Sequence, residues 1–167
     1  PQGVARAAHI LQTVLELQVD DPSSPVYGQF PMTIDGEVGD LNAALFIMPS
    51  LIAALQSAGD RLPETLTRQL ESTVRRAAVA TERRWDEELF CPVRDHKAYT
   101  NVFLLYIQSL TLAGNYLQDS RLTRVANAQW RRWFNHIAYL GIDEVSPTYS
   151  DVDYEALVRI TCPAPNR

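Results

Sequence analysis

Apolar residues recur at helical spacing along most of the chain. Between residues 4 and 17 they occupy positions 4, 7, 8, 10, 11, 14, 15 and 17, which is the periodicity of a helix rather than of a strand. The run Asp-Asp-Pro-Ser-Ser-Pro at 20–25 then ends this helix, because two prolines and short polar side chains disfavour its continuation. Similar patterns predict further helices at 41–57, 63–85, 102–114, 121–139 and 151–160. The sequence therefore predicts an all-α fold.

The predicted helices are of two kinds. Those at 41–57 and 102–114 are apolar on nearly every face, which predicts burial all round. Those at 63–85 and 121–139 carry one apolar stripe and a charged face, which is typical of helices at a surface. Asp40 and Asp119 (or Ser120) precede two of these helices and are expected as N-caps, and Gly114 is expected to end the helix before it.

The two kinds of helix alternate in a fixed order. A long polar and aromatic loop leads to an apolar helix, and a short turn leads to an amphipathic one, at 27–85, at 91–139 and again from 141, with a period of about 55 residues. The apolar helices would then be inner, the amphipathic ones outer, and all long loops would emerge at one end. This layout predicts an (α/α) toroid, a ring of helical hairpins, here a partial ring of about three hairpins. A plain helical bundle is the alternative, but it does not explain the placement of the loops.

Composition narrows the class of partner. The chain has 167 residues, a net charge of −5 and one lysine, so neither nucleic acid nor an anionic membrane is an expected partner. Its two cysteines and three histidines have no metal-ligand spacing, and no phosphate-binding glycine loop is present, so we expect no metal and no cofactor. The chain starts without Met inside a helical pattern. We expect residues 1–167 to form a single all-α domain or a fragment of a larger toroid.

Four sequence blocks support this architecture by resemblance. They are VYGQFPM, GEVGDLNAALFIMPSL, AYTNVFLLYIQSLTLAG and DEVSPTYSDVDYEAL. In this order they resemble (α/α)-toroid proteins of the polysaccharide lyase and glycoside hydrolase type, in particular uncharacterised members with a Glu-x-x-Ser-Pro-Thr-Tyr loop. This chain departs from their pattern at Val145, where an asparagine is more usual. The resemblance implies a carbohydrate or other small-molecule ligand at the loop end, with further hairpins supplied by a longer chain or an oligomer.

Acidic residues beside two of the predicted helix starts are candidates for general acid and base. A glycosidase needs two carboxylates facing each other across the scissile bond. Glu144, Asp151 and Asp153 are candidates in the third polar stretch, and Asp40 in the first. Each also has a structural alternative, since Asp40 and Asp151 can cap helices and Glu144 can pair with an arginine.

Tyrosines and amides in the same loops suit lyase chemistry instead. In a lyase, a tyrosine or histidine handles the proton next to a uronate carboxylate, and an amide or guanidinium group stabilises the resulting enolate. Tyr149 and Tyr99 fit the first role, while Asn101, Asn42 and His96 fit positions around it. Asn101 as a helix cap and His96 as a solvated residue are the structural alternatives.

Two aromatics in the first loop, Tyr27 and Phe30, are candidates for a sugar-stacking surface, although packing beneath the loop explains them equally well. The toroid interpretation also predicts that Glu144 and Tyr149 lie close to Asn101 and Asp40. Two other functions remain open from the sequence. One is a non-catalytic helical scaffold that binds a protein or a small apolar ligand, and the other is an isoprenoid cyclase.

Overall fold

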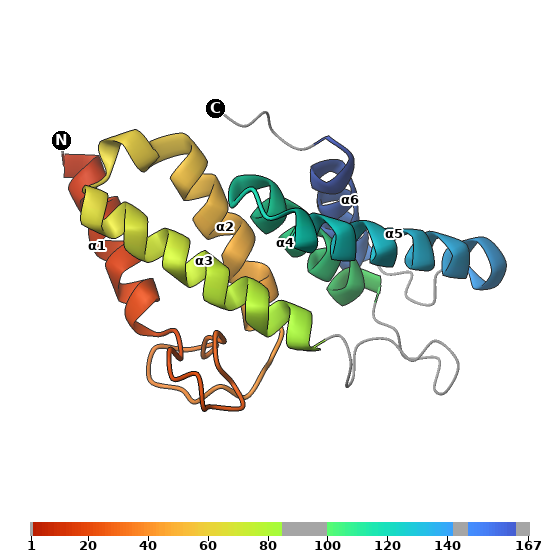
Figure 1. Cartoon of the computed structure of the whole chain (residues 1–167), viewed down its shortest axis with the longest axis horizontal. Helices are drawn as coiled ribbons and strands as arrows, with labels where there is room; N and C mark the ends of the chain where they lie inside the picture. Colours follow the sequence, from red (N-terminus) through yellow and green to blue (C-terminus); the bar gives the residue numbers. More distant parts are fainter. Residues whose placement is uncertain (1, 85–99, 142–146, 163–167) are drawn as a thin grey trace. The chain divides into compact units, whose positions relative to one another are not determined.

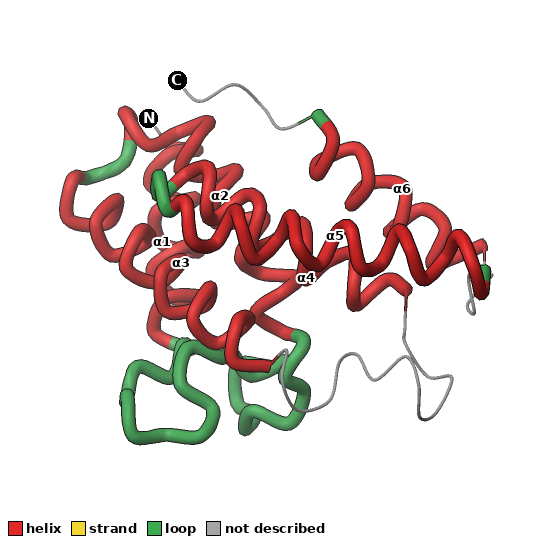
Figure 2. The backbone as a smooth tube through the Cα atoms, turned by 45° about the vertical axis from the view of Figure 1, so that its right-hand side comes forward, coloured by secondary structure: helices red, strands yellow, loops and turns green. Residues whose placement is uncertain are grey.

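The computed structural model describes residues 2–84, 100–141 and 147–162. The described residues form helices and no strand, which confirms the all-α prediction (Figure 2). The elements are α1 (Gln2–Glu16), α2 (Ala43–Ala58), a 3-10 turn η1 (Gly59–Arg61), α3 (Glu64–Arg84), α4 (Thr100–Tyr116), α5 (Ser120–Leu140) and α6 (Pro147–Thr161).

The chain divides into two compact units, residues 1–80 and residues 81–166. The first contains α1, α2, η1 and most of α3, and the second contains the last turn of α3 with α4, α5 and α6. Each unit has its own buried core, so each is described by itself.

In the first unit, α2 supplies the most apolar surface. Eight of its residues are buried, including Leu45, Met48 and Ile52 at no more than 1% exposure. Helix α3 returns antiparallel to α2 after the short η1 turn (Figure 1) and buries the stripe Leu66, Leu70, Val74, Ala77 and Ala78. The prediction that the 41–57 helix is buried all round is wrong for α2, because positions 46, 50, 53 and 57 are exposed along one face and Phe46 is 46% exposed. The single buried stripe predicted for the amphipathic helix is confirmed for α3.

The connection between α1 and α2 gathers at one end of the first unit (Figure 1) and is anchored there by Gln18. The buried side chain of Gln18 donates to the carbonyls of Gly28 (3.0 Å) and Thr73 (3.1 Å), and its Oε1 accepts from Arg76 Nε (2.7 Å). Gly28 has a φ of +81°, and a Cβ there would lie 2.3 Å from the Arg76 carbonyl oxygen. Only glycine therefore lets the loop approach α3 this closely.

In the second unit, α4 is the central element. All its residues from Thr100 to Leu110 are buried, and both α5 and α6 pack against it. Helix α5 contributes the inward stripe of Leu122, Ala126 and Trp133. The side chain of Asp119 accepts hydrogen bonds from the backbone N–H groups of Arg121 (2.9 Å) and Leu122 (3.4 Å), so the predicted N-cap of α5 is confirmed.

Two predicted helix boundaries differ from the structure, the first by only two residues. Gly114 does not end α4 but lies inside it, where a Cβ would be 2.6 Å from Thr123 Oγ1, so this glycine permits close packing against the start of α5. Helix α6 begins at Pro147, four residues before its predicted start. Proline is favoured in the first turn of a helix, where its missing N–H has no intrahelical partner to lose. Asp151 therefore lies within α6 and does not cap it.

Candidate functional site

One of several buried side-chain oxygens without a partner in the described part of the second unit lies at the start of α4. Asn101 is the second residue of that helix and is only 6% exposed. Its Oδ1 atom is buried and accepts no hydrogen bond from the described part of the chain. An asparagine cap would accept a bond from a backbone N–H of the first turn, so the cap alternative for Asn101 is wrong. A buried carbonyl oxygen left in this state costs about 1–3 kcal/mol.

The first unit repeats this feature at the start of α2. Asn42 occupies the N-cap position in a helical conformation, makes no side-chain cap bond, and buries an Oδ1 atom that has no partner within the described residues. The Oδ1 atom of Asp40 accepts from the Asn42 backbone N–H at 2.8 Å, which closes a turn just before the helix. Asn42 rather than Asp40 occupies the N-cap position of α2, so the predicted N-cap role of Asp40 is wrong. Both predominantly buried helices thus begin with an asparagine whose oxygen is free to accept a hydrogen bond.

The aromatic candidates of the first loop differ from each other. Phe30 is completely buried, so neither ring face is available for stacking on a sugar, and its predicted binding role is wrong. The loop backbone holds it inward, because the N–H of Val19 donates to the Gln29 carbonyl (3.0 Å) and the N–H of Gly28 to the Val19 carbonyl (2.8 Å). Tyr27 is half-buried and keeps a partly accessible side chain.

The third group of candidates is only partly covered by the structure. Glu144, His96 and Tyr99 lie outside the described residues. Tyr149 falls in the first turn of α6, and Asp153 is half-buried in the same helix. Asp40 and Asn101 belong to different units, and each is described within its own. The cluster of Glu144, Tyr149, Asn101 and Asp40 therefore stays a prediction.

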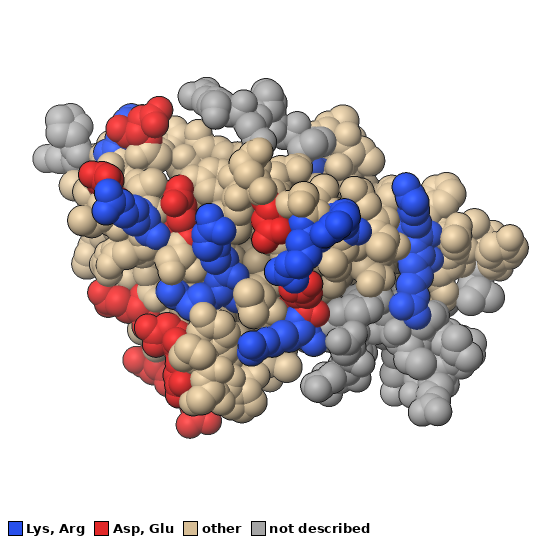
Figure 3. Space-filling model, in the orientation of Figure 1, with Lys and Arg blue, Asp and Glu red and all other residues tan. Residues whose placement is uncertain are grey.

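Charge is unevenly distributed over the described surface (Figure 3). Acidic side chains gather over the connection between α1 and α2, whereas α5 carries arginines and no acid. In the connection, Asp21 accepts from both the hydroxyl (2.7 Å) and the backbone N–H (2.9 Å) of Ser23, and these bonds lower the pKa of Asp21. In the second unit, a hydrogen bond from Arg121 to Glu82 raises the pKa of the Arg121 guanidinium. This pair joins the end of α3 to the start of α5.

Sequence reasoning missed three polar residues, namely the bonded pair Gln18 and Arg76 and the buried Gln108. Gln18 and Arg76 are 58 positions apart and belong to no motif, so only the folded chain reveals their bond. Gln108 is 3% exposed and buries an Oε1 atom without a partner in the described chain, seven residues after Asn101 on the same side of α4. A lone polar residue in an apolar helix is the signal that would have identified Gln108.

The remaining features of the described residues concern metal binding, disulfides and membrane-spanning helices. No three His, Cys, Asp or Glu side chains in these ranges are placed to hold a metal ion, and Cys162 is exposed and makes no disulfide. One helical stretch, Ala43–Arg61, is long and apolar enough to cross a membrane, with a mean hydropathy of 1.3. The same stretch is the core helix of the first unit, and core helices commonly meet this criterion.

These observations define an all-α protein with buried amide groups at the starts of its two apolar helices. Residues 1–165 match the family described as Domain of unknown function (DUF8769), and the chain belongs to that family. No curated protein and no solved structure matches the sequence.

Proposed function

We propose that this chain contributes helical hairpins to an (α/α) toroid whose loop end binds carbohydrate, as part of a polysaccharide lyase or a glycoside hydrolase. The proposal combines the resemblance of the four sequence blocks with two properties of the described residues. The first is the difference in burial between the apolar and the amphipathic helices. The second is that the asparagines at the starts of α2 and α4 have buried Oδ1 atoms without a partner in the described residues.

The difference in burial supports the toroid more strongly in the second unit than in the first. Helix α2 is followed by the amphipathic α3 after the three-residue η1, and α4 is followed by the amphipathic α5 after residues 117–119. In the second hairpin, α4 is buried on all faces from Thr100 to Leu110 and α5 keeps an exposed charged face, which is the burial expected of inner and outer helices in a ring of hairpins. In the first hairpin, α2 keeps one exposed face at positions 46, 50, 53 and 57 and buries the others.

The carrying observation for a ligand site is the buried, unsatisfied oxygen of Asn101. Buried polar groups without a partner are rare in native proteins, and those that persist commonly serve binding or catalysis, or hold an ordered water. A sugar hydroxyl is a donor that an amide oxygen accepts well. Asn42 offers the same acceptor at the start of the preceding apolar helix. Carbohydrate binding at the start of α4 would satisfy the Asn101 oxygen.

The test is a panel of uronate-containing and neutral polysaccharides, with binding and product formation measured for the chain. A new absorbance at about 232 nm identifies an unsaturated product and hence proton abstraction next to a carboxylate, which is lyase chemistry. New reducing ends without that absorbance identify a hydrolase. If no polysaccharide in the panel binds or reacts, the proposal is wrong.

Asn101→Leu is the variant that links the site to the activity, and Gln108→Leu is its matched control. Both substitutions remove a buried unpartnered oxygen from the same helix and the same side of it, but Gln108 lies about 10 Å further along the axis. We expect Asn101→Leu to reduce carbohydrate binding strongly and Gln108→Leu to leave it unchanged. If the two variants reduce carbohydrate binding equally, Asn101 no longer supports a ligand site at the start of α4.

A second candidate function, a non-catalytic scaffold that binds another protein, is favoured by one specific observation. The second unit exposes large apolar side chains on α5 and α6, namely Phe134 (56%), Tyr139 (88%), Tyr154 (70%) and Val158 (41%). Exposed aromatic groups of this kind mark protein interfaces more often than sugar clefts at helix termini. The scaffold would be favoured if the wild type binds no carbohydrate. It would also be favoured if substitutions at the loop end, such as Asn101→Leu, leave carbohydrate binding unchanged.

A further inference from the structure

The exposed face of α5 carries only positive charge. The helix contains Arg121, Arg124, Arg131 and Arg132 and no acidic residue. Arg124 and Arg131 are both exposed, and neither makes an ion pair with any described residue. They are seven positions apart, which places them in one row on the helix, about 10 Å from each other along its axis. The face therefore presents a row of uncompensated guanidinium groups.

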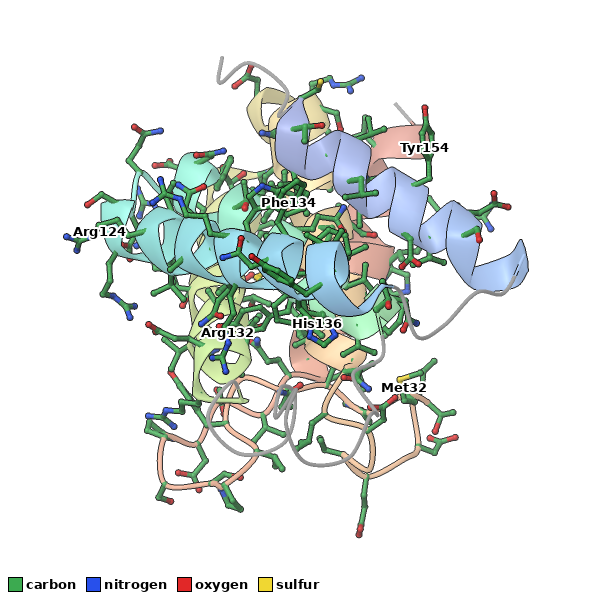
Figure 4. The ribbon with its side chains drawn as sticks, turned by 90° about the vertical axis from the view of Figure 1, so that its right-hand side faces the viewer. Met32, Arg124, Arg132, Phe134, His136 and Tyr154 are labelled. Atoms are coloured by element: carbon green, nitrogen blue, oxygen red, sulfur yellow. The ribbon has the colours of Figure 1, made fainter. Side chains whose placement is uncertain are left out.

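Large aromatic side chains accompany these arginines. Phe134 is 56% exposed and Tyr139 is 88% exposed, and both lie on the same solvent side of α5 as Arg124 and Arg131. In Figure 4 the side chains of Arg124, Arg132 and Phe134 extend from this helix. The buried side is already filled, because Trp130 and Trp133 stack with ring centroids 5.4 Å apart. Arginine and aromatic residues are the types most enriched at protein interfaces.

A negatively charged surface lies in the first unit, in the loop of residues 31–40. No lysine or arginine occurs between Arg6 and Arg61, so the acids of this region have no cationic neighbour in sequence. Asp35 and Glu37 are exposed and form no ion pair within the described chain. Two large apolar side chains beside them, Met32 (63%) and Ile34 (70%), are also exposed.

The backbone of this loop holds these side chains outward. The N–H of Gly36 donates to the Thr33 carbonyl at 3.0 Å, which closes a turn with Ile34 and Asp35 at its two central positions. At the far side of the loop, the Asp40 side chain accepts from the Asn42 backbone N–H and closes the turn into α2. The 31–40 loop therefore carries exposed apolar and acidic side chains around one hydrogen-bonded turn.

We propose that the arginine face of α5 binds the 31–40 loop of a second copy of this chain. The two surfaces are complementary in charge, since one carries only arginine and the other only carboxylate. They also match in composition, because each places exposed large apolar groups beside its charges, so both ion pairing and apolar burial accompany the contact. Both surfaces are present on every copy, and no other molecule is needed. This proposal does not depend on the proposed carbohydrate function.

Such a contact joins different patches of the two copies. It produces a closed pair if two chains can exchange loops reciprocally, and a ring or an open series if each chain contacts two different neighbours. The mass at high protein concentration separates these cases. A plateau at twice the monomer mass indicates the closed pair, and a larger mass indicates the ring or series. Either result supports the proposal.

The first experiment is sedimentation velocity on the whole chain from micromolar to millimolar concentration. We expect the average mass to rise above that of the 18.8 kDa monomer as concentration increases. The association should weaken between about 0.1 M and about 1 M salt, over which the Debye length falls from about 10 Å to about 3 Å. A monomer at every concentration would overturn the proposal.

Charge reversal then locates the contact. In one variant Arg124 and Arg131 are changed to glutamate, and in another Asp35 and Glu37 are changed to lysine. Each variant alone should associate about tenfold or more weakly than the wild type, since attraction is replaced by repulsion at exposed pairs. An equimolar mixture of the two variants should recover the association, because each then meets a surface of opposite charge. Failure of the mixture to associate would overturn the assignment.

The matched control carries Arg6→Glu and Arg75→Glu, at exposed positions of α1 and α3. These two substitutions change the net charge by the same amount as the two arginine substitutions in α5. This control should associate like the wild type, and circular dichroism should show that all variants keep their helices. Two further outcomes would overturn the proposal in favour of another occupant. One is a monomeric wild type whose α5 variant loses binding to anionic phospholipid vesicles. The other is a monomeric wild type in which the 31–40 loop contacts α5 of its own chain.

Discussion

Replacing Asn101 by leucine separates a functional asparagine from a structural one. If its side chain supported the fold, the substitution would remove a hydrogen bond and destabilise the protein. The structure shows a buried Oδ1 with no partner in the described residues, so the substitution removes an existing penalty instead. Leucine is larger but has the same branching at Cγ and is apolar, so it suits the buried surroundings of α4.

The expected change in the free energy of unfolding follows from the desolvation cost of an unsatisfied oxygen, which is about 1–3 kcal/mol. Part of that gain is lost to imperfect packing of the new side chain, and we expect Asn101→Leu to raise the free energy of unfolding by about 1 kcal/mol. For a chain of this length, that corresponds to a rise in Tm of roughly 2–4 °C. Thermal and urea unfolding, followed by circular dichroism, measure the change.

The same variant should lose carbohydrate binding, so stability and function would move in opposite directions. Gln108→Leu is expected to raise the Tm by a similar amount without affecting binding, because its oxygen is equally buried but lies away from the helix start. A fall in unfolding free energy of more than about 1 kcal/mol for Asn101→Leu would refute the reasoning, since it would show that the oxygen is satisfied.

Three further substitutions test the local structure by urea unfolding. Gly28→Ala should destabilise the protein by about 2 kcal/mol or more, because its Cβ would clash with the Arg76 carbonyl oxygen and the positive φ is unfavourable for alanine. Arg76→Ala should cost about 1–3 kcal/mol, since it leaves the buried Gln18 Oε1 without its donor. Asp119→Ala should cost about 1 kcal/mol, because the first turn of α5 loses its side-chain acceptor.

Each of these three predictions has its own check. Gly59→Ala is the control for Gly28, since Gly59 has helical angles and nothing within 4 Å of its Cβ position, and it should stabilise by about 0.4–1 kcal/mol. For Arg76, the double variant with Gln18→Leu should cost less than the sum of the single changes, whereas simple additivity would disprove their coupling. An Asp119→Asn variant should retain most of the stability, because asparagine also caps helices, and a loss equal to that of alanine would contradict the capping role.

Much of the secondary structure follows from local sequence. The helical periodicity at 4–17 and 121–139 predicted α1 and α5 to within about two residues, and Asp119 was one of two candidate caps named before the apolar stripe. Complete burial was predictable for the first three turns of α4 but not for α2, which exposes the apolar side chain of Phe46. These properties depend on neighbours in sequence, which is why the sequence reveals them.

The candidate site was less predictable, because it depends on the burial and hydrogen-bond partners of side chains in the folded chain. Asn101 was named as a catalytic candidate and Phe30 as a binding candidate, yet the fold buries Phe30 completely and leaves the Asn101 oxygen without a partner in the described chain. Both residues are compatible with either outcome by type alone. The difference arises from backbone hydrogen bonds of the loop, which hold Phe30 inward.

The sequence by itself therefore determined the helical class and the alternation of buried and amphipathic helices. Tertiary structure alone decided that Gly114 permits helix contact rather than ending α4, and that Gln18 joins the first loop to Arg76. The physical reason is the range of the forces concerned. Helix formation is set by bonds between residues four positions apart, whereas close packing and buried polar contacts are set by segments that meet only when the chain folds.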